Sequence, residues 1–221
     1  MITYDSISRR SINQCRVFQN GGIISEMEEL LNYFGLSFTI SKFLPYFLTV
    51  FLGIVFSKLL YRHISASIII RILFITLITV LPFGIYFAIN PIFEGDISNE
   101  GISIKNNLDL PKNKDLLIIA LADCPFCIQS QNTIKIIHQK NKKIKAEYLI
   151  VNGTKQDSIR YARRLLGFAS CRTIKNSVPL LQTIQGSFPS FILVRKGKLN
   201  KVWSNNTFGV RAWDEVVSCI E

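Results

Sequence analysis

Residues 116–127 read LLIIALADCPFC, an apolar run followed closely by two cysteines three positions apart. The apolar run predicts a buried strand, and the residues after Cys124 predict a helix. A strand that leads into a helix at Cys124 places that thiol among unpaired backbone N–H groups, at the positive end of the helix dipole. Both effects favour the thiolate, which is the reacting species in disulfide exchange. Because CxxC is also a spacing of metal ligands, the motif alone leaves redox and metal-binding functions open.

Two apolar segments in the first half of the chain are long enough to span a membrane. Residues 43–61 contain one charged side chain, Lys58, and residues 72–89 contain none. The second segment continues past Arg71 to residue 68, so we predict transmembrane helices at 43–61 and 68–89. A bilayer core of ~30 Å needs about 20 such residues in a helix. Lys58 and Arg71 stand near the ends of their segments, where long side chains reach the membrane interface.

The charges that flank these segments predict their orientation. Lys58, Arg62 and Arg71 surround the short connecting loop without an acidic residue, whereas the twenty residues after Ile89 hold four acidic side chains and one lysine. Positive residues favour the cytoplasmic side. We therefore expect two spans in the cell (inner) membrane, with both chain ends and the C-terminal domain on the periplasmic or extracytoplasmic side.

Residues 1–42 form an N-terminal tail, of which residues 1–26 show no charged start followed by an apolar core and match no targeting signal. From Met27 the sequence MEELLNYF predicts an amphipathic lead into the first membrane segment. We hypothesise that translation begins at Met27 and that residues 1–26 are an extension introduced by the gene prediction. Cys15 would then have no function.

The net charge of +11 lies entirely on the second half of the chain. Residues 102–221 hold nineteen basic and eight acidic side chains, whereas residues 1–101 hold seven of each. A basic domain can bind nucleic acid, but no interleaving of aromatic and basic residues indicates a base-stacking surface. We expect no nucleic-acid partner, and a domain tethered beside anionic lipid accounts for the charge.

Residues 90–113 are rich in Pro, Gly, Asn and Asp and predict a linker. After it, residues 114–221 show the alternation of an α/β domain with a mixed sheet. The expected strands are 115–122, 144–151, 190–195 and 201–204. The expected helices are 124–139, 156–166, 173–183 and 210–220. About 109 residues are enough for one hydrophobic core.

This domain resembles thioredoxin-fold proteins in three features. They are the strand that delivers CPFC at 124–127, the element Phe188-Pro189-Ser190 before an apolar strand, and the hairpin FILVRKGK at 191–198. Cys127 and Pro189 are separated by 61 residues. This insertion, together with the membrane tether, resembles the TlpA-like branch, whose members reduce extracytoplasmic disulfides. The fold class we expect is therefore a thioredoxin-like mixed sheet flanked by helices, preceded by two transmembrane helices.

The resemblance implies roles for individual residues. Cys124 would be the nucleophile, and Cys127 would resolve the mixed disulfide. In the family the proline that corresponds to Pro189 is cis and faces the active site, and the backbone of Phe188 would pair with the substrate chain. The implied substrate groove is formed by Pro125, Phe126, Phe188, Pro189 and Ser190. We expect no cofactor and no bound metal ion at this site.

Two positions depart from the thioredoxin pattern. Asp123 stands where thioredoxins usually carry Trp, and a carboxylate there should raise the pKa of Cys124. Ile118 replaces the buried acid of thioredoxin and removes one proton relay. Neither the rate nor the reduction potential of thioredoxin can therefore be carried over to this chain.

Other functions remain open at this point. A zinc site needs two further ligands at short spacing, whereas Cys171 and Cys219 stand alone and the two histidines, His63 and His138, lie far apart in sequence. Copper(I) needs only two thiolates, so a copper(I)-binding thioredoxin-fold chaperone is the alternative. A third hypothesis is a non-catalytic assembly factor that acts through its membrane helices. Cys171 and Cys219 are expected as core residues, with a structural disulfide between them as the alternative.

The expected partners follow from the leading hypothesis, a protein-disulfide reductase. Its substrates would be protein disulfides and thiols, although the sequence leaves oxidase and isomerase activity open. A reductase outside the cytoplasm needs electrons, and the two membrane segments contain no cysteine to carry them. We therefore expect a transmembrane electron-donor protein as a partner.

Overall fold

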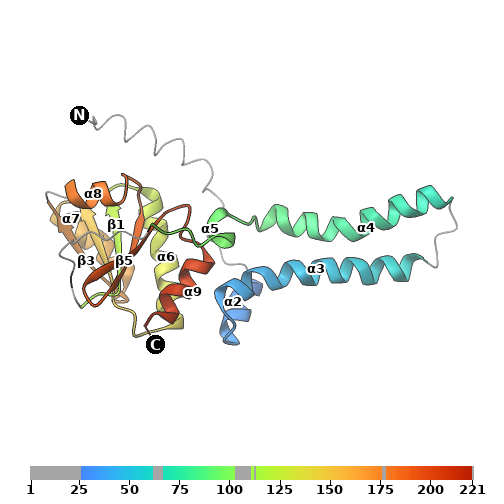
Figure 1. The fold of residues 1–221 in the computed structure, drawn as a ribbon, viewed down its shortest axis with the longest axis horizontal. Helices are drawn as coiled ribbons and strands as arrows, with labels where there is room; N and C mark the ends of the chain where they lie inside the picture. Colours follow the sequence, from blue (N-terminus) through green and yellow to red (C-terminus); the bar gives the residue numbers. More distant parts are fainter. Residues whose placement is uncertain (1–25, 62–66, 103–110, 112, 176–177, 221) are drawn as a thin grey trace. The chain divides into compact units, whose positions relative to one another are not determined.

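The chain divides into a helical unit and a unit built around a sheet (Figure 1). A computed structural model describes residues 26–61, 67–102, 111, 113–175 and 178–220 of the 221-residue chain. The helical unit lies within residues 26–92 and the sheet unit within residues 93–220. The expectations for residues 1–25 with Cys15, and for Arg62 and His63 of the loop, lie outside the described residues.

The helical unit consists of α2 (Glu26–Tyr33), α3 (Phe38–Tyr61) and α4 (Ile68–Ile89). Helix α3 begins five residues before the predicted position, and α4 has the predicted bounds. Both are long and apolar enough to cross a membrane. In α4, which is described in full, no residue is buried, so its apolar side chains remain at least partly exposed.

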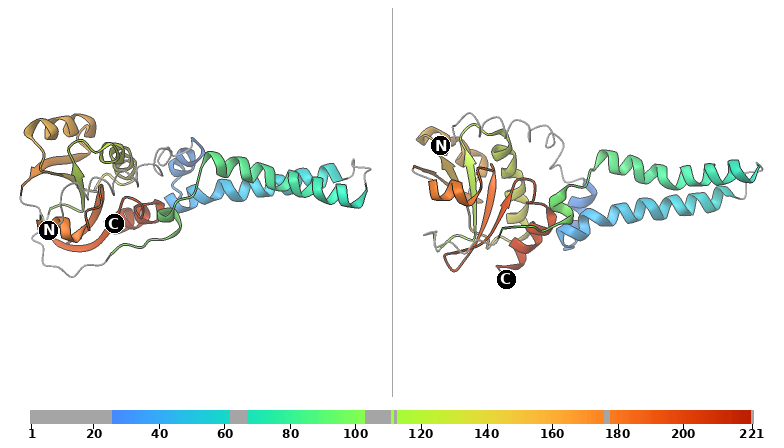
Figure 2. Two further views of the ribbon diagram at one scale, coloured as in Figure 1. Left: turned by 90° about the horizontal axis from the view of Figure 1, so that it is seen from above. Right: turned by 45° about the horizontal axis from the view of Figure 1, so that its top comes forward.

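Small residues let α3 and α4 pack closely. A Cβ atom on Gly53 would lie 2.5 Å from the carbonyl oxygen of Thr79, so only glycine permits this approach. One turn later, the Oγ of Ser57 lies 2.6 Å from the Oγ1 of Thr79. Small residues and hydroxyl pairs of this kind are typical of contacts between membrane helices. The two helices run antiparallel, side by side (Figure 2).

The sheet unit contains a five-stranded mixed sheet in the order β3-β2-β1-β4-β5. Strands β1, β2 and β3 are parallel, whereas β4 is antiparallel to β1 and β5 is antiparallel to β4. The bounds are Leu116–Leu121, Ala146–Val151, Ala169–Ile174, Ser190–Arg195 and Lys198–Ser204 for β1 to β5. The mixed sheet predicted from the alternation of apolar segments is confirmed.

Helices cover both faces of the sheet (Figure 2). One face, with Leu117 and Ile119, packs against α8 (Val178–Thr183). Side chains alternate along a strand, so Ile118 faces the opposite side. Helix α6 (Pro125–Lys140) buries Cys127, Ile134 and Ile137, and contacts both α7 (Lys155–Leu165) and α9 (Val210–Ser218).

The prediction of one helix over residues 173–183 is wrong. Strand β3 occupies Ala169–Ile174, and only Val178–Thr183 is helical. Strand β3 lies at the edge of the sheet and is only half-buried, so its sequence lacks the continuous apolar run of the central strands. The pairing of β3 with β2 decides its structure.

The first ten residues after Ile92, predicted as linker, are part of the sheet unit. Helix α5 (Glu94–Ile97) contacts α9, and Asp96 accepts a hydrogen bond from the N–H of Val210 at 3.3 Å. Ile102 pairs with Val202 of β5 as an isolated bridge. Residues 103–110 and 112 of the expected linker lie outside the described residues.

Candidate functional site

Cys124 lies at the junction between β1 and α6 and caps the helix. Its Sγ accepts a hydrogen bond from the backbone N–H of Cys127 at 3.3 Å. Pro125 follows in the first turn of the helix, where the missing N–H loses no hydrogen bond. The expectation that CPFC opens a helix is confirmed, and the cap aims an N–H group at the sulfur.

The pKa values of the two thiols of the motif are shifted in opposite directions. A hydrogen bond from the Cys127 side chain, together with the backbone N–H groups of Cys127 and Phe126, lowers the pKa of Cys124 against the opposing effect of burial. Burial raises the pKa of Cys127 well above its ordinary value, and the neighbouring Cys124 raises it further. Cys124 is half-buried and Cys127 is completely buried. The site thus combines a half-buried thiol whose pKa is lowered with a fully buried thiol whose pKa is raised.

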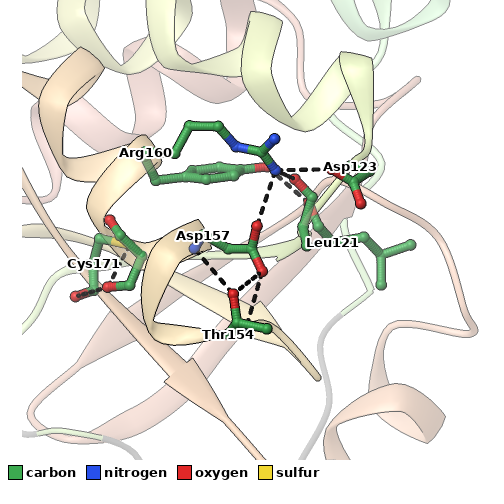
Figure 3. Close-up of polar contacts among 9 residues, drawn as sticks. Leu121, Asp123, Thr154, Asp157, Arg160 and Cys171 are labelled. Atoms are coloured by element: carbon green, nitrogen blue, oxygen red, sulfur yellow. Dashed lines mark hydrogen bonds and ion pairs between the residues drawn. The ribbon is translucent and has the colours of Figure 1, made fainter.

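Asp123 does not have the predicted effect on Cys124. The prediction that its carboxylate would raise the pKa of Cys124 is wrong, since burial alone opposes the hydrogen bonds that lower this pKa. The Asp123 carboxylate instead forms an ion pair with Arg160 of α7 at 2.8 Å (Figure 3). Its charge is therefore balanced by a guanidinium.

Pro189 lies at the same end of the sheet as Cys124. In the register of the antiparallel pair β1 and β4, Ile119 is opposite Ser190, so the residues just before β4 lie beside the segment that leaves β1. The Phe188–Pro189 peptide bond is cis, as the resemblance implies. Pro189 is buried, and Phe188 packs partly against the core.

Among the other groove residues predicted, the structure separates exposed from buried positions. Pro125 is exposed and Phe126 is half-buried, so both present surface at the start of α6. Ser190 is 1% exposed, and its hydroxyl donates a hydrogen bond to the carbonyl of Ser187 at 2.7 Å. Its side chain therefore stabilises the loop around Pro189 and is too buried to contact a substrate.

A pair of buried hydroxyl groups, which we did not predict, lies next to Cys127. The Oγ of Ser130 donates to the carbonyl of Cys127 at 2.8 Å and lies 3.0 Å from the phenol oxygen of Tyr148. Tyr148 is the strand neighbour of Ile118, the position at which thioredoxin carries its acid. Burial raises the pKa of Tyr148 well above its ordinary value, so the phenol stays protonated. The tyrosine within the buried strand β2 is the sequence feature that could have indicated this pair.

The remaining described cysteines lie apart from the CPFC site. Cys171 on β3 is a free thiol whose Sγ lies 3.6 Å from the Oγ of Ser158. Cys219 is also free and lines a cavity of about 630 Å³ beside Asp115 and Arg195. The alternative of a disulfide between Cys171 and Cys219 is not realised in this structure. Within the described residues, no group of three His, Cys, Asp or Glu side chains is placed to hold a metal ion.

No family model matches the chain, and no curated protein matches it. Among solved structures, it is similar to a secreted disulfide oxidoreductase of Mycobacterium tuberculosis, homologous to E. coli DsbE. That match has 12% identity and a TM-score of 0.40, and covers 50% of this chain and 84% of the other. The thioredoxin domain of a thiol-disulfide oxidoreductase from Bacteroides vulgatus matches with 16% identity and a TM-score of 0.37, over 50% of this chain and 81% of the other. The sheet unit has a thioredoxin-like fold: a mixed five-stranded sheet, the CPFC motif at the start of α6 and a cis proline before β4. Two apolar helices precede this unit in the chain.

Proposed function

We propose that this chain is a membrane-anchored thiol–disulfide oxidoreductase that reduces disulfides of extracytoplasmic proteins. The observation that carries the proposal is the contrast between the two thiols. Cys124 caps α6 and has a lowered pKa, whereas Cys127 is buried and has a raised pKa. An acidic thiol at a helix start is the arrangement that dithiol–disulfide exchange requires.

The reaction has two exchange steps. The Cys124 thiolate attacks one sulfur of a substrate disulfide, the substrate S–S bond breaks, and the released substrate thiolate takes a proton from water. Cys127 then gives up its proton, and its sulfur attacks the Sγ of Cys124 in the mixed disulfide. The bond between Cys124 and the substrate breaks, and a Cys124–Cys127 disulfide forms. The second substrate sulfur leaves as a thiolate and takes up the proton that Cys127 released. The substrate gains two electrons and two protons, and the dithiol of the protein is oxidised.

The substrate would lie across the loop before β4. Phe188 and Pro189 precede that strand beside the end of β1, and the exposed Pro125 opens α6. An extended substrate chain can pair with the backbone of Phe188, which would hold its disulfide against Cys124.

Helices α3 and α4 supply the membrane anchor in this proposal. The basic residues Lys58 and Arg71 near their connection favour a cytoplasmic loop and an extracytoplasmic sheet unit. The oxidised site must be reduced again, and neither apolar helix contains a cysteine. A second membrane protein that carries electrons as a dithiol would regenerate the site.

The test is reduction of insulin disulfides by the full chain in detergent micelles, with dithiothreitol as the electron source. We expect the wild-type protein to accelerate insulin reduction and Cys124→Ser to abolish the effect. Cys171→Ser is the matched control, since Cys171 lies on β3 at the sheet edge, and it should retain full activity. Full activity in Cys124→Ser would refute the proposal.

A further inference from the structure

Helix α7 holds the segment that joins β1 to the CPFC motif. The Nη2 of Arg160 donates to the carbonyl of Ala122 at 2.7 Å and forms an ion pair with Asp123 at 2.8 Å (Figure 3). The phenol of Tyr161, the next residue, donates to the carbonyl of Leu121 at 2.8 Å. Three consecutive residues before Cys124 are therefore fixed by two neighbouring side chains of α7.

The first turn of α7 orients Arg160. Thr154 caps the helix, and Asp157 accepts hydrogen bonds from the N–H and the hydroxyl of Thr154 at 2.8 and 2.7 Å. The other carboxylate oxygen of Asp157 lies 3.0 Å from the Nη2 of Arg160. The guanidinium thus lies between two carboxylates, one that is fixed by its own helix and one that precedes the reactive cysteine.

Asp123 carries a negative charge next to the thiol that must ionise. An unbalanced carboxylate beside Cys124 would oppose formation of the thiolate, because like charges repel at short distance. The causes that lower the pKa of Cys124 are hydrogen bonds from Cys127 and Phe126, and burial opposes them. The Arg160 and Asp123 side chains are 45% and 85% exposed, so the pair contributes little to the stability of the fold. Removing the guanidinium would leave the Asp123 carboxylate unbalanced one residue before Cys124.

We propose that Arg160 is a positioning residue of the CPFC site, which holds the turn at Ala122–Asp123 and balances the Asp123 carboxylate beside the reactive thiol. This inference rests on the proposed function, because the acidity of Cys124 matters only where the thiol exchanges disulfides. It gives helix α7 a role in the site that the cysteine motif alone does not indicate.

The test is the pH dependence of alkylation of Cys124 by iodoacetamide, a neutral reagent, followed by mass spectrometry on the reduced full chain. Arg160→Gln should move the midpoint to higher pH and slow alkylation below the midpoint about threefold, the effect of one nearby charge in a well-solvated site. Asp123→Asn added to Arg160→Gln should restore the wild-type profile. Arg163→Gln is the matched control, because Arg163 is an exposed arginine of the same helix, and it should leave the profile unchanged.

Three results would overturn the inference. The first is an unchanged alkylation profile in Arg160→Gln, and the second is an equal shift in Arg163→Gln. The third is a double variant that keeps the shifted profile, since the carboxylate would then not be the cause. Alkylation does not depend on disulfide reduction, so the two proposals fail separately. If the wild type does not reduce insulin, the proposed function is refuted, but the effect of Arg160 on the alkylation of Cys124 can still be observed. If the wild type reduces insulin and Arg160→Gln leaves the alkylation profile unchanged, only the inference about Arg160 is refuted.

Discussion

The backbone N–H of Cys127 donates to the Sγ of Cys124 at 3.3 Å, so the first cysteine of the motif caps the helix that carries the second. Hydrogen bonding from the Cys127 side chain is the largest cause that lowers the pKa of Cys124. In the proposed reaction, the residue that favours the Cys124 thiolate would also resolve the mixed disulfide.

The first prediction concerns the order of thiol reactivity. Cys124 has a lowered pKa, whereas burial raises the pKa of Cys127 and of Cys171. At neutral pH Cys124 should be alkylated first, and its rate should level off at a lower pH than the rate of Cys171. Peptide mass spectrometry of the reduced chain over a pH series checks this. Faster alkylation of Cys171 would contradict it.

The same shift predicts a pH dependence of stability in the reduced protein. The folded-state pKa of Cys124 lies below its ordinary value, so the thiolate stabilises the folded state fully above the pKa of the unfolded chain. This contribution is lost as the pH falls through the folded-state pKa. The difference in stability between the wild type and Cys124→Ser should therefore grow as the pH rises toward the ordinary value. Denaturant unfolding at several pH values measures it, and a difference that shrinks over this range would be inconsistent with the cap.

Tyr148→Phe removes the phenol that pairs with Ser130 beneath Cys127. The variant should lose about 1 kcal/mol of unfolding free energy, because one buried hydrogen bond is lost while the ring is kept. Both tryptophans, Trp203 and Trp213, lie in the sheet unit, so their fluorescence reports its unfolding in the full chain. An unchanged denaturation midpoint would show that the hydroxyl pair does not support the site.

Gly53→Ala should disrupt the packing of α3 on α4. The added Cβ would lie 2.5 Å from the backbone oxygen of Thr79, and such overpacking costs about 1–3 kcal/mol. Gly84→Ala is the matched control, since a Cβ there meets nothing within 4 Å. Thermal unfolding in detergent, followed by helical circular dichroism, should show a lower midpoint for Gly53→Ala only. Equal midpoints for the two variants would argue against the close approach.

Asp96→Ala should loosen the segment before the sheet. Asp96 is 7% exposed and accepts hydrogen bonds from the N–H groups of Phe93 at 3.1 Å and of Val210 at 3.3 Å. Loss of this cap of α9 should cost about 1–2 kcal/mol, measured by tryptophan fluorescence in denaturant. Glu94→Ala is the control, because the Glu94 side chain is exposed. A loss no larger than that of the control would mean that this segment does not support the sheet unit.

Local patterns in the sequence predict most of the fold and the centre of the site. The run before Cys124 is apolar at every position of β1, and the two long helices have strong apolar composition. Such signals need no knowledge of distant contacts. Strand β3 was missed because it is half-buried at the sheet edge, so its pairing with β2 fixes it, with little help from its own sequence.

The contacts that surround the site depend on tertiary structure. Arg160 is one basic residue among several on an amphipathic helix, and its partner Asp123 is 37 residues away in the chain. Tyr148 and Ser130 meet only because β2 and α6 pack together. Residues 93–102 read as a polar linker, and only the structure shows Asp96 capping α9. The sequence therefore indicates the thiols but not the residues that surround them.

The central claim is that the Cys124–Cys127 pair acts as a reductase. The most direct test is the reduction potential of this pair in the full chain, measured by equilibration with glutathione or dithiothreitol and quantification of the free thiols. For a reductase we expect a value closer to the potential of thioredoxin, about −270 mV, than to that of DsbA. A value close to that of DsbA, about −120 mV, would contradict a reductase and indicate an oxidase instead.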